Sequence, residues 1–393
     1  MLKMYFNFKD VFRAARLGFS PKKIWVFFCG LLLGLTVYNL FSYLAHAAAG
    51  RALADTWAIF GLLPLPWPDF GWAAWILWFL GAAGLGVSYM LASSVVARIT
   101  AEQLTGNEFY EIKEAVAFVK QSWKTVLGAP LVIVTFIAFI VFVPGLVLGL
   151  WGRIPYLGEL TVSILAVPVY LVCLFLTFLL AALMVALFYS PIVAGATKSD
   201  TFDNLFEIFS AMTSQPWRLV VYSGLLKMVV LLGFGTFAAF SYWAVMLAYK
   251  LLGLFMGEYF TGLAASAFNM YTPPMVLNLL LSVLQGWGLD QGFYLMNTPD
   301  LNWTGQVSAF FMGMSLNLVR LLVVSYAAAA TVVGQTIIYG IIVMKRDDRN
   351  IFERHEEKAP EESTPAVEEE KERKVVKLVK KAAAAKKPAK TSK

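Results

Sequence analysis

The sequence predicts an all-α polytopic membrane protein with six transmembrane helices, cytoplasmic interfacial amphipathic helices and both termini in the cytoplasm. Three observations predict this class. The 393-residue chain is 59% hydrophobic and only 15% charged, whereas soluble domains average about 25% charged residues. It contains several apolar runs that reach the roughly 20 residues needed to cross a bilayer core about 30 Å thick. Its lysines and arginines gather in alternate segments between those runs.

Six long apolar runs are each predicted to form one transmembrane helix. In chain order they cover residues 24–48, 72–97, 126–150, 160–189, 219–248 and 319–344. With the N-terminus inside, the segments on that side hold 27 of the 32 lysines and arginines, and the outer loops hold three. Because basic residues are retained on the cytoplasmic side, this asymmetry predicts cytoplasmic termini. The domains are then an amphipathic segment (1–23), a transmembrane domain (24–344) and a charged tail (345–393).

The cytoplasmic segments before the first, third and fifth crossings are amphipathic. Their apolar residues recur at intervals of three and four, the period of a helix with one apolar face. Such helices lie in the membrane interface with that face toward the acyl chains. We expect three of them, which turn into the bilayer at Pro21, near Trp123 and at Pro216. Their apolar stripes are Phe8, Val11, Phe12, Ala15 and Phe19; Phe109, Ile112, Val116, Val119 and Trp123; and Phe202, Leu205, Phe206, Phe209 and Met212.

Tryptophan and basic residues stand at the inner ends of these crossings. Trp prefers the headgroup level, and an adjacent Lys or Arg extends toward the lipid phosphates. We assign membrane anchoring to Trp25, Trp123, Lys124, Trp217 and Arg218. The shared plan is an interfacial helix, an anchor and a helical hairpin. It indicates either a threefold pseudo-repeat or the general appearance of cytoplasmic loops that enter a membrane.

Two outer segments differ from simple loops. Residues 51–72 carry three prolines among aromatic residues, which favours an extended segment on the membrane surface. Residues 250–306 are apolar but interrupted by Glu258, a Pro-Pro pair and several glycines. We expect outer-surface or re-entrant helices there, because the second apolar piece is short for a crossing and its turn carries no positive charge. Two additional crossings are the alternative.

The tail, residues 345–393, is predicted to be disordered and cytoplasmic. Residues 345–370 hold five basic and ten acidic side chains, whereas residues 371–393 hold ten basic and one acidic. Such like-charge blocks with few apolar residues bury no core. The basic block suits anionic lipid or an acidic partner; the alternative is a solubilising tail partly neutralised by its own acidic block. Because no aromatic residues alternate with the lysines, sequence-specific nucleic-acid binding is not expected.

Small residues four positions apart mark faces on which membrane helices approach closely. The sequence contains three such pairs on its predicted crossings. We expect contacts of this kind to form within one chain more often than between chains. The pairs are Gly30 with Gly34, Gly145 with Gly149, and Ala330 with Gly334.

Polar residues inside or near the crossings are few. Lys227, Asn317 and Arg320 are the candidates, and an intramembrane charge usually marks a functional site. For both cations we favour snorkelling, in which a long side chain reaches the headgroups; a functional intramembrane charge is the alternative. Cys29 and Cys173 lie inside apolar runs, which argues for packing residues and against a disulfide framework.

The sequence carries none of the common catalytic signatures. It contains no GxxxxGK[ST] phosphate loop, no HExxH metal pair, no GxSxG nucleophile elbow and no CxxC pair. We therefore expect a protein that is not an enzyme, with no catalytic residues, cofactor or metal.

Three stretches carry a resemblance to a known family: FYEIKEAVAFVKQSWKTVLGAPL, RIPYLGEL and SDTFDNLFEIFSAMTSQPWRLVVYSGLL. Here the chain resembles a family of uncharacterised bacterial six-helix inner-membrane proteins, over about residues 100–245. The resemblance implies a bacterial inner-membrane location. The family has no established activity, so the resemblance implies no functional residues.

These observations favour a non-enzymatic integral subunit or scaffold of a bacterial inner-membrane protein complex. Interfacial helices, an apolar outer segment and a charged tail all suit membrane-protein partners or a homo-oligomer, beside the lipid bilayer. The alternative is a transporter or flippase-like protein for a lipid or other apolar substrate. The interrupted outer segment and the repeated plan fit that second hypothesis.

Overall fold

The structure is a computed structural model that describes residues 4–197, 199–271 and 301–353. The chain divides into two units, Met1–Phe352 and Glu353–Lys393, and all of the described helices belong to the first. The described residues form helices joined by loops, without a strand. In chain order the helices are α1 (Phe8–Val11), α2 (Arg13–Gly18), α3 (Pro21–Ala48), α4 (Leu53–Phe60), α5 (Trp72–Leu104), α6 (Ile112–Trp151), α7 (Leu157–Ile164), α8 (Ala166–Ala196), α9 (Thr201–Ser214), α10 (Pro216–Met256), α11 (Glu258–Tyr271) and α13 (Trp303–Asp347).

Six of the described helices are long and apolar enough to cross a membrane, namely α3, α5, α6, α8, α10 and α13. The predicted all-α protein with six membrane-spanning helices is therefore confirmed. All six exceed the roughly 20 residues that a crossing needs, and three of them are at least twice that long. α6, α10 and α13 have 40, 41 and 45 residues, or about 60–68 Å at 1.5 Å per residue. A bilayer core is about 30 Å thick.

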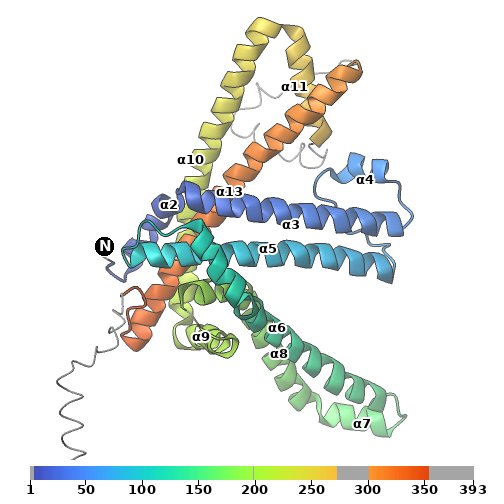
Figure 1. Cartoon of the computed structure of the whole chain (residues 1–393). Helices are drawn as coiled ribbons and strands as arrows, with labels where there is room; N and C mark the ends of the chain where they lie inside the picture. The colour runs from blue at the N-terminus through green and yellow to red at the C-terminus, as the bar shows by residue number, and fades with distance from the viewer. Residues whose placement is uncertain (1–3, 198, 272–300, 354–393) are drawn as a thin grey trace, which may run out of the picture. The chain divides into compact units, whose positions relative to one another are not determined.

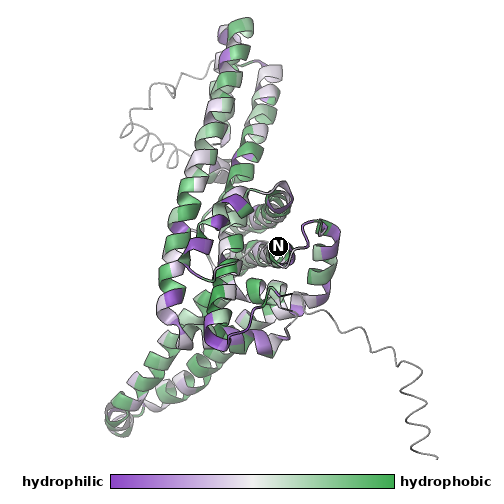
Figure 2. Ribbon diagram, turned by 90° about the vertical axis from the view of Figure 1, so that its left-hand side faces the viewer, coloured by the Kyte–Doolittle hydropathy of each residue, from purple (hydrophilic) through white to green (hydrophobic). Residues whose placement is uncertain are grey.

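The long helices pair into three hairpins (Figure 1). α3 packs along α5, α6 packs along α8, and α10 packs along α13, with α11 folded back against both of the last two. In Figure 1 the hairpins extend in different directions from a region around α13 where their inner ends meet. Figure 2 shows hydrophobic residues along most of the long helices and hydrophilic residues gathered around that meeting region.

The hydrophobic core lies where the hairpins meet. It takes in the C-terminal third of α5, the first turns of α3, the N-terminal halves of α6 and α10, and the end of α8. α13 runs through its centre, where the stretch from Tyr326 to Val343 is the most continuously buried part of the described chain. Beyond this core the hairpins expose large apolar side chains along much of their length.

Proline and capping residues determine where the long helices begin. Pro21 and Pro216 occupy the first positions of α3 and α10, where the missing N–H of proline is not needed, so the expected turns occur there. The turn expected near Trp123 does not occur. α6 begins earlier, at a capping box in which the Glu111 backbone N–H donates to the Glu114 carboxylate. It then runs through Trp123 without a break, because no proline or glycine interrupts that part of the helix.

Two of the expected interfacial helices form as separate elements, α1–α2 and α9, and part of each apolar stripe, namely Val11 and Leu205, Phe209 and Met212, packs on other helices. α1–α2 packs on α10 and α13, and α9 packs on α6 and α8. Protein neighbours, and not lipid alone, therefore select the buried face. The fully or nearly fully buried residues are Val11, Ala14, Asn204, Ile208 and Ala211, whereas Phe8, Phe12, Phe19, Phe202 and Phe206 are exposed.

The outer segment after α3 folds against that helix. It contains a helix that the sequence did not predict, α4, followed by an irregular stretch through the three prolines. Side chains of α3 satisfy the backbone carbonyls of this stretch, as buried carbonyls require. The Tyr38 hydroxyl donates to the Pro64 carbonyl at 2.7 Å, and the Tyr43 hydroxyl donates to the Gly61 carbonyl at 2.6 Å. His46 Nε2 lies 3.1 Å from the Leu65 carbonyl.

The third hairpin contains the first piece of the other outer segment. α11 has 14 residues, which is short for a crossing, and it folds back along α13. The ring of Tyr271 fits against Gly313, where a side chain would collide with it. The second apolar piece of this segment lies outside the described residues.

Cys29 and Cys173 are free and exposed, so the expectation that they are packing residues is wrong.

Candidate functional site at the junction of α9 with its neighbours

α9 makes polar contacts with three other helices, α6, α8 and α13. It begins after Asp200, whose backbone is extended as at a helix N-cap, and it ends at Gln215, directly before the Pro216 that starts α10. Its buried face carries one amide, Asn204, which is 0% exposed. The next turn carries Glu207 and Ser210 on a neighbouring face. α9 therefore makes two different polar contacts, one with α6 and α8 and the other with α13.

The first contact compensates for a proline in α6. Pro130 has no N–H, so the carbonyl of Val126, four residues earlier, loses its helical hydrogen bond. The hydroxyl of Ser190, on α8, donates to that carbonyl at 2.7 Å. The side-chain amide of Asn204 donates in turn to the Ser190 hydroxyl at 2.9 Å and approaches the Thr125 carbonyl at 3.2 Å. We call these four residues, Thr125, Val126, Ser190 and Asn204, the buried polar node.

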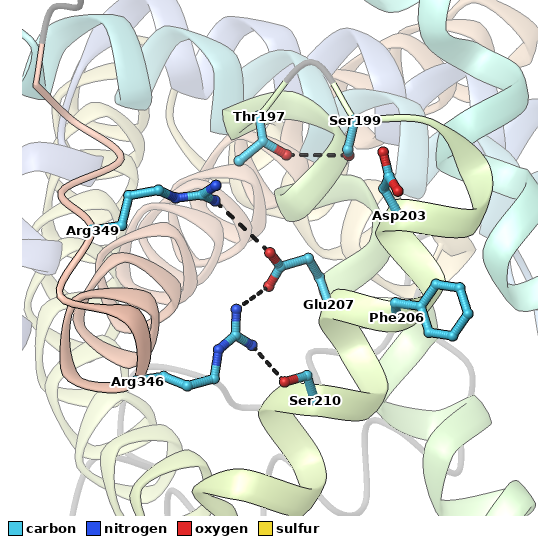
Figure 3. A pocket seen from close by; sticks show the side chains of 8 residues that line it. All are labelled: Thr197, Ser199, Asp203, Phe206, Glu207, Ser210, Arg346 and Arg349. Atoms are coloured by element: carbon cyan, nitrogen blue, oxygen red, sulfur yellow. Dashed lines mark hydrogen bonds and ion pairs between the residues drawn. The ribbon is translucent and has the colours of Figure 1, made fainter.

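The second contact joins α9 to the inner end of α13 (Figure 3). The guanidinium of Arg346 donates to the Glu207 carboxylate at 2.8 Å, to the Ser210 hydroxyl at 2.9 Å and to the neighbouring Asp347 carboxylate. Arg349 lies 3.8 Å from the other oxygen of Glu207. Arg346 and Glu207 are 15% and 21% exposed, so this ion pair is partly shielded from water and is worth more than a surface pair.

An open hollow of about 540 Å³ lies beside this ion pair. Figure 3 shows Glu207 between the two arginines, with Asp203 one turn earlier on α9. Within the hollow, the Thr197 hydroxyl and the Arg346 guanidinium donate, whereas the Ser199 and Ser210 hydroxyls and the Glu207 carboxylate accept. The Glu207–Arg346 ion pair thus links α9 to α13 at one side of this hollow. Its lining residues are Thr197, Ser199, Asp203, Phe206, Glu207, Ser210, Arg346 and Arg349.

The predicted anchoring residues occupy exposed positions on three different helices. Trp25, Trp123 and Trp217 are 56%, 48% and 58% exposed, and Lys124 is exposed beside Trp123. The guanidinium of Arg218 lies over the ring of Trp217, 5.0 Å from its centroid, and donates to the side chain of Gln215. This last group stands at the start of α10, directly after α9.

The predicted intramembrane polar residues are separate from the α9 junction. Asn317 and Arg320 pair with each other on α13, where the guanidinium donates to the amide oxygen at 3.0 Å. The same guanidinium lies 5.2 Å from the ring centroid of Phe268 on α11. Lys227 is exposed on α10. The structure thus brings two of the three candidates together and leaves the third alone on another helix.

The predicted packing residues fall into two groups. A Cβ atom at Gly30 would lie 2.7 Å from the Cβ of Ala92, and one at Gly34 would lie 2.9 Å from Leu85, so this pair lets α3 and α5 approach closely. On α13, Ala330 packs under Gly18 of α2, and Gly334 faces Leu226 of α10. Gly145 and Gly149, in contrast, face open space, with no neighbouring helix among the described residues.

Sequence reasoning missed the buried polar node and one buried lysine. Lys23 is 1% exposed, and its amino group donates to the Leu17 carbonyl at 3.1 Å and to the Gln103 side chain at 2.8 Å. No described carboxylate lies within ion-pair distance of it. Its position beside Lys22, in a basic segment predicted to be cytoplasmic, gave no signal of burial. For the node, Pro130 inside a long apolar run was the available signal, because it leaves a carbonyl that needs a donor.

The described residues contain no group of three or more His, Cys, Asp or Glu side chains arranged to hold a metal ion. Comparison of the chain with family models, with curated proteins and with solved structures finds no match in any of the three.

Proposed function

We propose that the chain is a non-enzymatic integral subunit or scaffold of a bacterial inner-membrane protein complex. One observation carries the proposal: the exposed apolar surface of α10 is longer than a membrane is thick. Large apolar side chains are exposed from Val220 to Met256, a span of about 54 Å along the helix. The hydrocarbon core covers about 30 Å of it. Lipid tails do not reach the rest of this exposed apolar surface, which therefore needs another binding partner.

The surplus apolar surface lies on the inner half of α10. That half packs beside α2 and α9, the helices predicted to lie at the cytoplasmic surface. Yet Met228, Leu231 and Leu232 on it are 68%, 68% and 74% exposed. A patch of this kind outside the bilayer marks a protein interface. The partner is another membrane protein or a second copy of this chain.

The bacterial location and the orientation belong to the same proposal. Their support is the resemblance over residues 100–245 and the concentration of basic residues in the segments predicted to be cytoplasmic. Cytoplasmic termini place the basic tail where it can meet anionic lipid or an acidic partner surface.

The test is extraction of the tail-tagged protein from its native membrane in mild detergent, followed by mass spectrometry of everything that stays bound. We expect at least one protein in stoichiometric amount, or a complex larger than one chain. The variant Leu231→Gln/Leu232→Gln should lower the amount of bound partner at least tenfold. A matched control, Leu157→Gln/Leu160→Gln, changes two equally exposed apolar residues on α7 and should leave the partner bound.

A monomer that purifies without protein partners would contradict the proposal. If that monomer carried a single enriched lipid or other apolar molecule, the transporter or flippase-like alternative would replace it.

A further inference from the structure

The two polar contacts of α9 lie on one rigid turn of helix. Asn204, in the buried polar node, and Glu207, in the ion pair with Arg346, are three residues apart, which is about 4.5 Å along the helix axis. A movement of α9 that breaks one contact therefore displaces the groups of the other. α9 connects α13 to the α6–α8 hairpin through these two contacts.

The buried polar node stands at a weak point of the hairpin. Pro130 interrupts the hydrogen bonding of α6, and Pro191 interrupts α8 directly after Ser190. The hydrogen bond from Ser190 to the Val126 carbonyl shows that the two interruptions face each other. Prolines inside helices produce kinks and permit bending. We call the region from Thr125 to Pro130 of α6, together with Ser190 and Pro191 of α8, the proline hinge.

We call the part of the α6–α8 hairpin beyond the proline hinge the arm; it is long, and its outer part makes few contacts with other helices. From Pro130 to the end of α6 at Trp151 it extends about 32 Å, and most of the large apolar side chains between Leu131 and Trp151 are exposed. Next to the hinge the arm still packs on the core, where Phe188 contacts Tyr89 of α5 and Phe178 contacts Phe209 of α9. Farther out, its contacts among the described residues are within the hairpin and with α7. A small rotation at the hinge therefore moves the tip by several ångströms while the contacts of Phe178 and Phe188 with α9 and α5 shift much less, because they lie closer to the hinge.

We propose that α9 couples the inner end of α13 to the proline hinge, so that the state of the Glu207–Arg346 ion pair sets the angle of the α6–α8 arm. When Arg346 binds Glu207, α9 stays packed on α6 and α8, and the Asn204 amide binds Ser190, whose hydroxyl donates to the Val126 carbonyl. When that pair opens, α9 shifts, the node loosens and the arm changes its angle. Ion pairs and hydrogen bonds at the ends of a rigid element are a physical route for such coupling. The inference does not depend on the proposed scaffold role.

The chain carries a natural pair of reporters for this movement. Cys29 on α3 and Cys173 on the α8 arm are its two cysteines, and both are free and exposed. Cys173 lies 18 residues before Pro191, about 27 Å from the proline hinge. A rotation of 10° at the hinge would move it by about 5 Å. Spin labels on the two native thiols therefore measure the arm angle by double electron–electron resonance, without an engineered cysteine.

The experiment uses the full-length chain, spin-labelled at both cysteines, in bilayer nanodiscs. We expect one narrow distance distribution for the wild type. Glu207→Gln should shift its mean by about 3–6 Å or add a second population. Asp203→Asn is the matched control, because Asp203 is an exposed acid on the same helix and forms no ion pair with α13 among the described residues; it should leave the distribution unchanged.

Coupling is tested by combining changes at the two contacts. Asn204→Leu, which keeps the side-chain volume and removes the amide, should shift the distribution by itself, and Glu207→Gln should then add nothing further. Ser190→Ala replaces Asn204→Leu if the latter fails to fold, as judged by helicity and by elution as a single species. An unchanged distribution for Glu207→Gln overturns the proposal. So does a double variant whose shift equals the sum of the two single shifts, because the contacts would then act independently.

Discussion

Pro130 explains why two polar side chains, those of Ser190 and Asn204, are needed among apolar helices, which composition alone does not show. Ser190 and Asn204 stand in apolar or amphipathic segments, where a lone hydroxyl or amide is usually unremarkable. They become necessary only because the proline leaves the Val126 carbonyl without a donor, and that carbonyl meets Ser190 only after α6 and α8 have packed. The proline is visible in the sequence; its partner on another helix is not. The same holds for Lys23, whose acceptors come from α2 and α5.

The node makes a prediction at the residue scale about Ser190→Ala. The change leaves the Val126 carbonyl unpaired and removes an acceptor of the Asn204 amide. We expect the free energy of unfolding to fall by about 1–2 kcal/mol, since an unpaired buried polar group costs about that much. The measurement is denaturant or SDS titration in bicelles, with helicity as the signal. Ser163→Ala is the control, because that hydroxyl is exposed and bonds only within its own helix.

A second background makes this prediction specific to the proline. In Pro130→Ala the residue at position 130 regains an N–H, which can satisfy the Val126 carbonyl within α6. Ser190→Ala should therefore cost less in that background than in the wild type. Equal costs in both backgrounds would show that the stability of this region does not depend on the freed carbonyl.

The helices were predictable from the sequence where a long apolar run determines them. Their ends and buried residues were less predictable where contacts with neighbouring helices determine them. Hydropathy located all six long helices, because a bilayer-length apolar run has few other solutions. It missed their ends: α6 starts at Ile112 and α13 at Trp303, since amphipathic residues continue a helix after the apolar run stops. It also missed the burial of Asn204 on α9, because this amide binds a hydrogen-bonding site that forms only in the folded protein.

The glycine pairs give a prediction at the element scale. Gly30→Ala places a methyl group against Ala92, where α3 and α5 are in contact, and we expect a loss of about 1–3 kcal/mol in unfolding free energy from overpacking. Gly145→Ala meets open space among the described residues and should not lower that free energy; it should raise it by up to about 1 kcal/mol, because Ala favours a helix more than Gly. The same titration in bicelles measures both. A Gly145→Ala variant as unstable as Gly30→Ala would place a partner helix on the α6 face.

At the scale of the whole molecule, the positions of α2 and α9 along α13 constrain how the protein sits in a membrane. The Tyr326 hydroxyl donates to the carbonyl of Ala15 at the α2 end, and Arg346 binds Glu207 of α9. These two points on α13 are 20 residues apart, or about 30 Å, the thickness of a bilayer core. If α2 and α9 both lie at the cytoplasmic surface, this part of α13 cannot cross the bilayer between them.

Exposure along the helices supports the same conclusion. The inner parts of the hairpins are buried in one protein core, whereas their outer parts expose apolar side chains. On α13 the exposed part includes Trp303, Phe311 and Val324, and burial becomes continuous after Tyr326. A lipid belt around the outer parts and a protein core on the cytoplasmic side account for both patterns. The crossing of α13 would then be about residues 303–324, which differs from the predicted 319–344.

This arrangement predicts the depth of Met314, which is 47% exposed near the middle of residues 303–324. In a background without the native cysteines (Cys29→Ser, Cys173→Ser), a spin label on Met314→Cys in nanodiscs should have high oxygen and low nickel-chelate accessibility, as at the centre of the bilayer.

A label on Lys9→Cys should be reached by membrane-impermeant reagents only from the cytoplasmic side of inverted vesicles, and one on Asp69→Cys only from the outer side. A Met314 label as accessible to the nickel chelate as the one at Asp69 would instead place that residue at the outer headgroups. The buried stretch from Tyr326 to Val343 would then be the crossing, and α2 would have to enter the bilayer with it.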